Sequence, residues 1–368
     1  MNNAKNIMKN QGVNAKRESV IIWDKNKVLI LGGLIAVVLI VAAVCYEQLR
    51  PRLIMTVGSE KIYLTDMMYD IYTQEQSGNS ISSIYQQIYG SDYWNAQVDE
   101  DGNTGAEVAK DAALAAAQQR EVLYQEAVVQ GYTLTDEEKT AVAEKVKTTR
   151  ESMTDAQKKM NGLDEKTLTK VLERDTLASR YKQNVIDSFD IDDAAITKTI
   201  SKEDNRQYDL QYYYVATKKT DNEGKSTDLS DAEKADLETK MNELKTKAVK
   251  AEDFSKLLEE NDDSGITYQT KALIETDKDF ISDKALKQIK KMKNKEITDV
   301  LVGDDGSYYL VRMENNNSTE AYDNAVKEAI STEENTQFEE SYSNMLDNYT
   351  IEENDDEWDK VKMGQVTL

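Results

Sequence analysis

Tyrosine is the residue type whose placement first suggests chemistry in this chain. Four tyrosines lie between Gln207 and Ala216, in the stretch QYDLQYYYVA, whereas the whole chain of 368 residues contains no histidine. A phenol can donate a hydrogen bond, but with a pKa near 10 it does not change its protonation state near neutral pH. Any chemistry here would therefore rest on hydrogen bonding and shape. The alternative is that these tyrosines simply pack in a half-buried sheet.

Other candidate sites have little support. The stretch VDEDGNTG alternates Asp99, Asp101 and Asn103, as a calcium-binding loop does. An EF-hand also needs glycine at the sixth position and glutamate at the twelfth, where this chain has Thr104 and Lys110. We therefore predict a solvated loop and no metal site. The sequence has no nucleophile elbow, phosphate-binding loop or dinucleotide fingerprint, so we expect no cofactor and neither a hydrolase nor a kinase.

The charge distribution argues against nucleic acid as a partner. The net charge is −23. Residues 1–27 hold six basic and two acidic side chains and residues 28–45 hold none, so the excess of negative charge lies entirely in residues 46–368. A surface that acidic repels nucleic acid and anionic lipid.

An apolar run between these two regions predicts a membrane anchor. Residues 28–45 begin with VLILGGLIAVVLIVAAV, which spans about 26 Å as a helix, close to the hydrocarbon thickness of about 30 Å. Trp23 and Tyr46 flank the run at the positions that interfacial aromatic side chains prefer. The preceding basic residues predict a cytoplasmic tail over 1–27, a single-pass anchor in the cell membrane and an extracytoplasmic bulk. A buried core helix is the alternative.

The fate of this anchor stays open. We favour an uncleaved segment, because the leader is long and has no obvious small-x-small cleavage site. Lipidation of Cys45 is a further alternative, although Val44 stands where a lipoprotein signal usually has a smaller residue. Cys45 is the sole cysteine, so an intramolecular disulfide is excluded.

The exported part begins with a predicted helical domain over residues 53–200. It opens with a short hairpin around Gly58, and Thr65 is the expected N-cap of the first helix. Residues 77–106, rich in Ser, Asn, Gly and Asp, predict an irregular loop. Thr135 begins a capping box that opens one of the later helices.

A smaller α+β domain is predicted over residues 205–315. Alternating tyrosines around Tyr212 indicate a strand with one face buried. Ser230 begins a capping box, and Gly306 lies in the turn of a closing hairpin. A helix follows over residues 319–347, and residues 348–368 form an acidic tail that we expect to be frayed. The predicted fold class is α+β, mostly α.

This order of elements resembles the PrsA/SurA family of exported foldases. The stretches AAAQQREVLYQEAVVQGYTLTDEEK and GLDEKTLTKVLERDTLASRYKQNV look like the family's paired chaperone helices. EDFSKLLEENDD, KNKEITDVLV and DGSYYLVRME are similar to parts of an inserted parvulin-type prolyl isomerase domain. The resemblance implies a transmembrane anchor, a helical chaperone domain with a parvulin-like insert, and a returning C-terminal helix that packs on the chaperone domain.

The parvulin-like domain departs from the family pattern where the active site would lie. Tyr212 and Tyr309 stand where the family has two histidines. The glycine-rich loop is replaced by SGITYQTKALIE, in which Ser264 takes a position of that loop and only Gly265 is kept, and Lys295 replaces a turn glycine. The resemblance therefore implies a domain that has lost its isomerase activity.

The resemblance also implies that unfolded or partly folded exported polypeptides are the partners, bound in a cradle between the two domains. Met and Tyr adapt to varied partners, which suits such a surface, although ordinary core packing is the alternative for each residue. The candidate peptide-binding residues are Phe254, Leu257, Ile289, Met292, Leu310, Met68, Tyr72, Tyr342 and Met345. We predict a membrane-anchored extracytoplasmic chaperone. An active prolyl isomerase with an altered pocket, or a membrane-tethered adaptor for one folded partner, are the alternatives, and a homodimer stays open.

Overall fold

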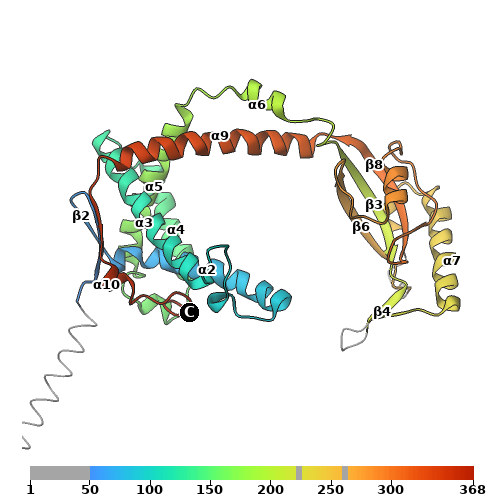
Figure 1. Cartoon of the computed structure of the whole chain (residues 1–368), viewed down its shortest axis with the longest axis horizontal. Coiled ribbons are helices and arrows are strands. Elements are labelled where there is room, and N and C mark those ends of the chain that lie inside the picture. Colours follow the sequence, from blue (N-terminus) through green and yellow to red (C-terminus); the bar gives the residue numbers. More distant parts are fainter. Residues whose placement is uncertain (1–49, 221–225, 259–263) are drawn as a thin grey trace, which may run out of the picture. The chain divides into compact units, whose positions relative to one another are not determined.

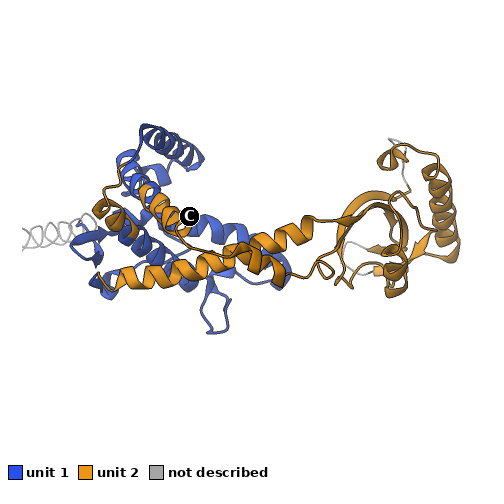
Figure 2. Cartoon of the chain, turned by 90° about the horizontal axis from the view of Figure 1, so that it is seen from above, with its two compact units in different colours: residues 1–122, 134–176, 349–368 blue, residues 123–133, 177–348 orange. Residues whose placement is uncertain are grey.

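The structure is a computed structural model, and it describes residues 50–220, 226–258 and 264–368. These residues form a mostly helical α+β fold with two compact units, shown in Figure 2. The predicted anchor and Cys45 lie outside the described residues. None of the helices in the described ranges has the length and apolarity that a membrane span requires.

Unit 1 comprises residues 50–122, 134–176 and 349–368. Its predicted hairpin is confirmed: β1 (Leu53–Val57) pairs antiparallel with β2 (Glu60–Tyr63) across a turn in which Gly58 has φ +59°. Helix α2 (Leu64–Tyr89) follows at once (Figure 1). The expectation that Thr65 is the N-cap is wrong. Tyr63 is the N-cap, and its N–H donates to the side chain of Asp66 at 3.1 Å.

The loop predicted over residues 77–106 is helical in its first half. Helix α2 continues to Tyr89 and ends at Gly90, which has φ +69°. A short 3₁₀ helix, η1 (Tyr93–Asn95), then returns Trp94 to the side of α2. A Cβ at Gly78 would lie 2.2 Å from the Trp94 ring, so the glycine that suggested a loop is instead the place where the indole packs.

The remaining helices follow the capping signals. They are α3 (Gly105–Val129), α4 (Asp136–Ser152), the 3₁₀ helix η2 (Gln157–Lys159) and α5 (Glu165–Asp187). The capping box at Thr135 is confirmed: its hydroxyl accepts from the N–H of Glu138, and the Glu138 carboxylate accepts from the N–H of Thr135. The ends of α3 and α5 belong to unit 2.

The expectation of a frayed C-terminal tail is wrong. Strand β9 (Ile351–Glu353) adds to β1 and gives the sheet order β2-β1-β9, and helix α10 (Asp355–Trp358) follows. Trp358, Val361, Met363 and Thr367 are buried. The tail is therefore part of unit 1, because its scattered apolar residues meet partners that lie far away in the sequence.

Unit 2 contains a four-stranded antiparallel sheet in the order β6-β3-β8-β7. Its strands are β3 (Gln207–Val215), β6 (Thr267–Ile274), β7 (Leu301–Val302) and β8 (Tyr308–Ser318), and Figure 1 shows helices beside them. The small hairpin of β4 (Lys218–Thr220) and β5 (Ser226–Asp228) precedes α7 (Asp231–Ala248), whose capping box at Ser230 is confirmed.

The central strand β3 is buried on both faces, not on one. One face packs with α8 (Asp283–Ile289) through residues that include Tyr208, Leu210 and Tyr212. The other face packs with α7 and the 3₁₀ helix η3 (Phe254–Lys256), and there Tyr213 is fully buried. Helices α6 (Asp193–Thr199) and α9 (Glu320–Leu346), which contact each other, complete unit 2.

Candidate functional sites

The structure brings Tyr212 and Tyr309 together on the α8 face of the sheet. Tyr214 pairs with Tyr309 across β3 and β8, and Tyr212 pairs with Val311, so Tyr212 and Tyr309 are diagonal neighbours. Their ring centroids lie 6.1 Å apart. Phe280 completes an aromatic cluster, 5.2 Å from Tyr212 and 6.0 Å from Tyr309.

The electrostatics of this cluster oppose acid–base chemistry. Burial, and secondarily the charge of Asp305, raises the pKa of Tyr309 to about 12, and burial also raises the pKa of Tyr212. Both phenols are therefore neutral throughout the physiological range. The Tyr212 hydroxyl already donates to Gln269 Oε1 at 2.5 Å. The cluster offers aromatic surface and one engaged donor, with no group that exchanges a proton near pH 7.

Ser264 lies away from these tyrosines. It lines a surface cavity of about 370 Å³ together with residues such as Val215, Leu229 and Glu233. Its hydroxyl accepts from the N–H of Ile266 at 3.2 Å. The structure therefore does not join the three positions that the resemblance assigned to one active site.

The five predicted pocket residues of the sheet domain are divided between the two faces of the sheet. Phe254, Leu257 and Leu310 belong to the cluster on the α7 face, whereas Ile289 and Met292 belong to the α8 face. None of the five is more than 7% exposed.

A buried tyrosine joins the residues on the α7 face. The hydroxyl of Tyr213 donates to the carbonyl of Phe254 at 2.8 Å and accepts from the N–H of Leu257 at 3.0 Å. These residues form the cores of two layers and do not line one common pocket.

The predicted peptide-binding residues of the helices are also mostly packed. Met68 and Tyr72, on α2, are buried at 5% and 7% exposure. On α9, Tyr342 stacks with Phe338 at a centroid distance of 6.0 Å, and Met345 is half-buried. A peptide surface at these positions stays a prediction.

The second half of α2 exposes an apolar surface that the sequence analysis missed. Ile81, Ile84, Ile88 and Tyr89 are 45, 59, 64 and 67% exposed. We call these four residues the isoleucine stripe. The signal was present in the sequence, because apolar residues recur there at helical spacing. It was overlooked because the surrounding Ser, Gly and Asn predicted a loop.

Aromatic contacts hold the exposed part of α2 in place. Trp94 packs on Gly78 and its indole N–H donates to Asn79 at 3.4 Å. Tyr85 lies 4.6 Å from Tyr89 and 5.9 Å from Tyr93 by ring centroids. The stripe is thus carried on a part of α2 in which Gly78 packs against Trp94 and most other residues are exposed.

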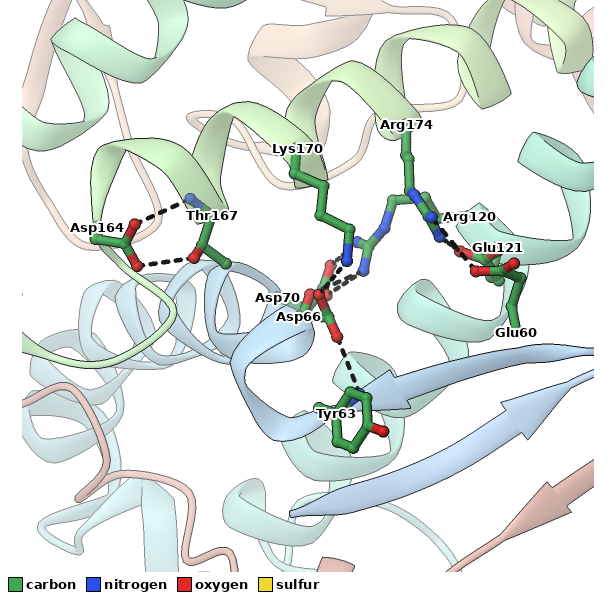
Figure 3. A network of polar contacts seen from close by, with 10 residues as sticks. All are labelled: Glu60, Tyr63, Asp66, Asp70, Arg120, Glu121, Asp164, Thr167, Lys170 and Arg174. Carbon is green, nitrogen blue, oxygen red and sulfur yellow. Dashed lines mark hydrogen bonds and ion pairs between the residues drawn. The ribbon is translucent and has the colours of Figure 1, made fainter. Parts of the chain in front are cut away.

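A buried charge network fixes the first half of α2 (Figure 3). Both terminal nitrogens of Arg120, on α3, donate to the Asp70 carboxylate, at 2.5 and 2.8 Å, and both side chains are 8% exposed. Burial raises the pKa of the Asp70 carboxyl, and the guanidinium opposes that rise. From α5, Lys170 donates to Asp66 at 2.8 Å and Arg174 donates to Glu121 at 2.6 Å.

The C-terminal segment, residues 361–367, is tied to the middle of α2. Glu75 is fully buried, and its carboxylate accepts from the N–H groups of Gln365 at 3.0 Å and Val366 at 2.9 Å. It also accepts from both the N–H and the hydroxyl of Thr367. Helix α2 is therefore secured along its first half and at its middle, and the part beyond carries the isoleucine stripe.

No cluster of three or more potential metal-ligating side chains occurs within the residues that the structure describes. In the loop that resembles a calcium site, the Asp99 carboxylate accepts from the N–H of Asn103 and from its side-chain amide, both at 2.8 Å. These contacts close the loop on itself.

No family model matches the chain, and no curated protein matches it. Solved structures of SurA-like chaperones and PrsA foldases do match, at low identity. A SurA-like chaperone of Campylobacter jejuni is 15% identical, with 82% of this chain and 99% of that chain covered and a TM-score of 0.29. The PrsA foldase of Lactococcus lactis is 16% identical, with coverages of 82 and 95% and a TM-score of 0.31. PrsA of Bacillus subtilis is 16% identical, with coverages of 69 and 91% and a TM-score of 0.25. At these TM-scores the matches assign no role to any residue.

Proposed function

We propose that the chain is an extracytoplasmic chaperone, anchored in the membrane by residues 28–45, that binds apolar segments of unfolded exported polypeptides. The isoleucine stripe is the observation that carries this proposal. In a chain of which 31% of the residues are charged, the sequence from Gln76 to Ser91 has no charge at all. Exposed apolar surface of this kind marks an interaction site.

The size and charge of the stripe favour an unfolded client over other partners. Even if each side chain offered the roughly 200 Å² that an aromatic ring buries, four of them at these exposures would supply about 500 Å². A stable protein–protein interface needs about 800 Å² from each partner. Helices that lie on anionic membranes carry lysine or arginine on their polar face, and this stretch has neither. A small apolar surface without basic residues suits weak, repeated contact with short apolar segments.

We further propose that the sheet domain does not catalyse prolyl isomerisation. Rotation about a peptide bond faces a barrier of about 18–20 kcal/mol, which an isomerase lowers by binding the twisted amide more tightly than the planar one. The neutral, mutually packed Tyr212 and Tyr309 support the proposal, because one phenol proton is already donated to Gln269 and neither group titrates near pH 7.

The proposal is tested by removing the stripe without unfolding α2. The double variant Ile84→Gln/Ile88→Gln keeps good helix formers at both positions. Burial of a whole isoleucine side chain stabilises a complex by about 1.5–3 kcal/mol, and about three-fifths of each side chain is exposed. We expect about 1 kcal/mol per residue, or about 30-fold weaker binding of reduced, carboxymethylated α-lactalbumin for the pair.

Val129→Gln is the matched control, because Val129 is an exposed apolar residue outside the stripe, at 77% exposure. It should leave binding of the unfolded protein within about twofold. Native α-lactalbumin, tested in parallel, should not bind. If the double variant binds as the unaltered chain does, the stripe is not the client site. Binding of a single folded partner in place of unfolded chains would favour the adaptor.

A further inference from the structure

The two edges of the four-stranded sheet in unit 2 differ sharply. Strand β7, at one edge, has two residues, and beyond it β8 is covered by main-chain hydrogen bonds from residues 295–298. Strand β6, at the other edge, has eight residues and pairs with β3 in an unbroken register from Ile274 to Thr267. Elsewhere in the described ranges, the strands at sheet edges have four residues or fewer. Strand β6 is therefore the longest edge strand among the residues that the structure describes.

The phase of the hydrogen bonding shows which groups of β6 face outward. The N–H of Glu275 donates to the carbonyl of Arg206 at 2.9 Å. Glu275 and Arg206 therefore form a hydrogen-bonded pair just beyond the end of β6. In antiparallel pairing such pairs alternate with pairs whose N–H and C=O groups point away from the neighbouring strand. Alternation places the main-chain groups of Tyr268, Thr270 and Ala272 on the outer edge.

These outward groups have no hydrogen-bond partner in the residues that the structure describes. Ile274, the next residue in phase, is capped: its N–H donates to the Asp277 side chain at 3.0 Å and its carbonyl accepts from the Asp277 N–H at 3.1 Å. One end of the edge is closed in this way, and the middle offers a row of alternating donors and acceptors.

The edge lacks the usual protection. Natural proteins shield edge strands with proline, charge, bulges or short length. Strand β6 has no proline and no bulge, and its one charged residue is Lys271. The Lys271 ammonium lies 5.5 Å from the centroid of the Phe280 ring, over a face of the sheet. Thr270 and Ala272 are exposed beside the free main-chain groups.

We propose that the outer edge of β6 binds an extended segment of an unfolded polypeptide as an additional strand. The inference rests on the proposed chaperone function. Main-chain hydrogen bonds supply affinity without reading sequence. Thr270 and Ala272, the exposed side chains beside the outward groups, are small and so impose little preference on the side chains of the bound segment. A second copy of this chain is disfavoured as the occupant, because each copy carries a net charge of −23.

The experiment follows amide hydrogen exchange in the full chain, held in lipid nanodiscs. The probe is a ten-residue peptide of four Thr-Val pairs between two lysines, and the control peptide has its two central pairs replaced by proline. With the first peptide at ten times its Kd, exchange at the amides of Tyr268, Thr270 and Ala272 should slow about tenfold. The control peptide should leave the three amides unchanged. Binding of the first peptide without protection of these amides overturns the inference.

A pair of variants tests the same edge independently. Thr270→Pro removes an N–H that faces outward and so leaves the pairing of β6 with β3 intact, whereas Thr270→Val retains the N–H. The proline variant should bind the peptide at least tenfold more weakly than the valine variant. Equal binding by both overturns the inference.

The proposed function can be tested separately from the binding of a peptide to the edge of β6. If the whole chain binds carboxymethylated α-lactalbumin through the isoleucine stripe while the β6 amides stay unprotected, the edge inference fails alone. If the unfolded protein does not bind at all, the proposed function fails with it.

Discussion

The replacement Arg120→Met is a strict test of how α2 is held in place. It removes the cation that pairs with Asp70 through two hydrogen bonds in a site where both side chains are 8% exposed. Loss of one partner from a buried ion pair typically costs 3–5 kcal/mol. Protonating the stranded carboxyl at pH 7 would cost about 4 kcal/mol, because its ordinary pKa lies near 4 and each pH unit corresponds to about 1.4 kcal/mol. Both values predict that Arg120→Met lowers the free energy of unfolding by about 4 kcal/mol at pH 7.

The loss of stability caused by Arg120→Met should depend on pH. In the variant, burial without the guanidinium raises the pKa of Asp70 in the folded state above its unfolded value. The folded state then binds a proton that the unfolded state has released, so the variant gains stability as the pH falls toward the ordinary pKa. Between pH 7 and pH 5 the deficit relative to the unaltered chain should therefore shrink, by at most about 1.4 kcal/mol for each pH unit.

The assay is urea unfolding of the chain followed by tryptophan fluorescence at pH 7 and pH 5. The control Lys170→Met removes a cation that pairs with Asp66 at 2.8 Å but is 52% exposed, so its cost should stay below about 1 kcal/mol at either pH. The double variant Asp70→Leu/Arg120→Met should recover most of the lost stability, since neither charge of this pair is left buried without its partner. Equal losses for Arg120→Met and Lys170→Met, or a deficit that does not change with pH, would refute this account of the network.

Three further predictions concern Glu75, Glu357 and the sheet domain. Glu75→Gln replaces an oxygen that accepts hydrogen bonds with an amide that donates them, so we expect a loss of about 2–4 kcal/mol in the free energy of unfolding, measured in urea. A change below about 0.5 kcal/mol would contradict a stabilising role for the contacts between Glu75 and the C-terminal segment. Contacts with Lys360, Arg50 and Arg52 lower the pKa of Glu357 to about 2 from 4.5. Its contribution to stability should therefore be complete above pH 4.5 and disappear as the pH falls toward 2. The difference in urea midpoint between the unaltered chain and Glu357→Gln should accordingly be constant above pH 4.5 and shrink toward pH 2, and a difference that does not change with pH would contradict this. In a protease-free prolyl isomerisation assay, the chain should leave the rate at the uncatalysed baseline while an active parvulin accelerates it; a clear acceleration would show that pocket shape alone can catalyse the rotation.

Local signals in the sequence predicted much of the framework. The capping boxes at Thr135 and Ser230 mark the starts of α4 and α7, because both partners of each box lie within four residues. Gly58 and Gly306 mark hairpin turns in which the backbone has positive φ. These features depend on neighbours in the sequence, and so they can be recognised without the fold.

The features that the sequence did not predict depend on distant contacts. Residues 77–89 look like a loop until Trp94 is known to pack on Gly78. The C-terminal segment looks frayed until its contacts with Glu75, almost three hundred residues away, are known. The alternation in β3 indicated one buried face correctly, but Tyr213 shows that a second helix covers the other face. Periodicity assigns residues to faces without saying what covers each face.

Site-specific photo-crosslinking tests the central claim most directly. A photoreactive amino acid is placed at position 84 in the isoleucine stripe or at position 129 outside it, and the full chain is irradiated with carboxymethylated or native α-lactalbumin. The account predicts strong crosslinking from position 84 to the unfolded protein, little to the native protein, and little to either from position 129. Crosslinks of equal yield from both positions, or from position 84 to the native protein, would contradict a client site on the stripe.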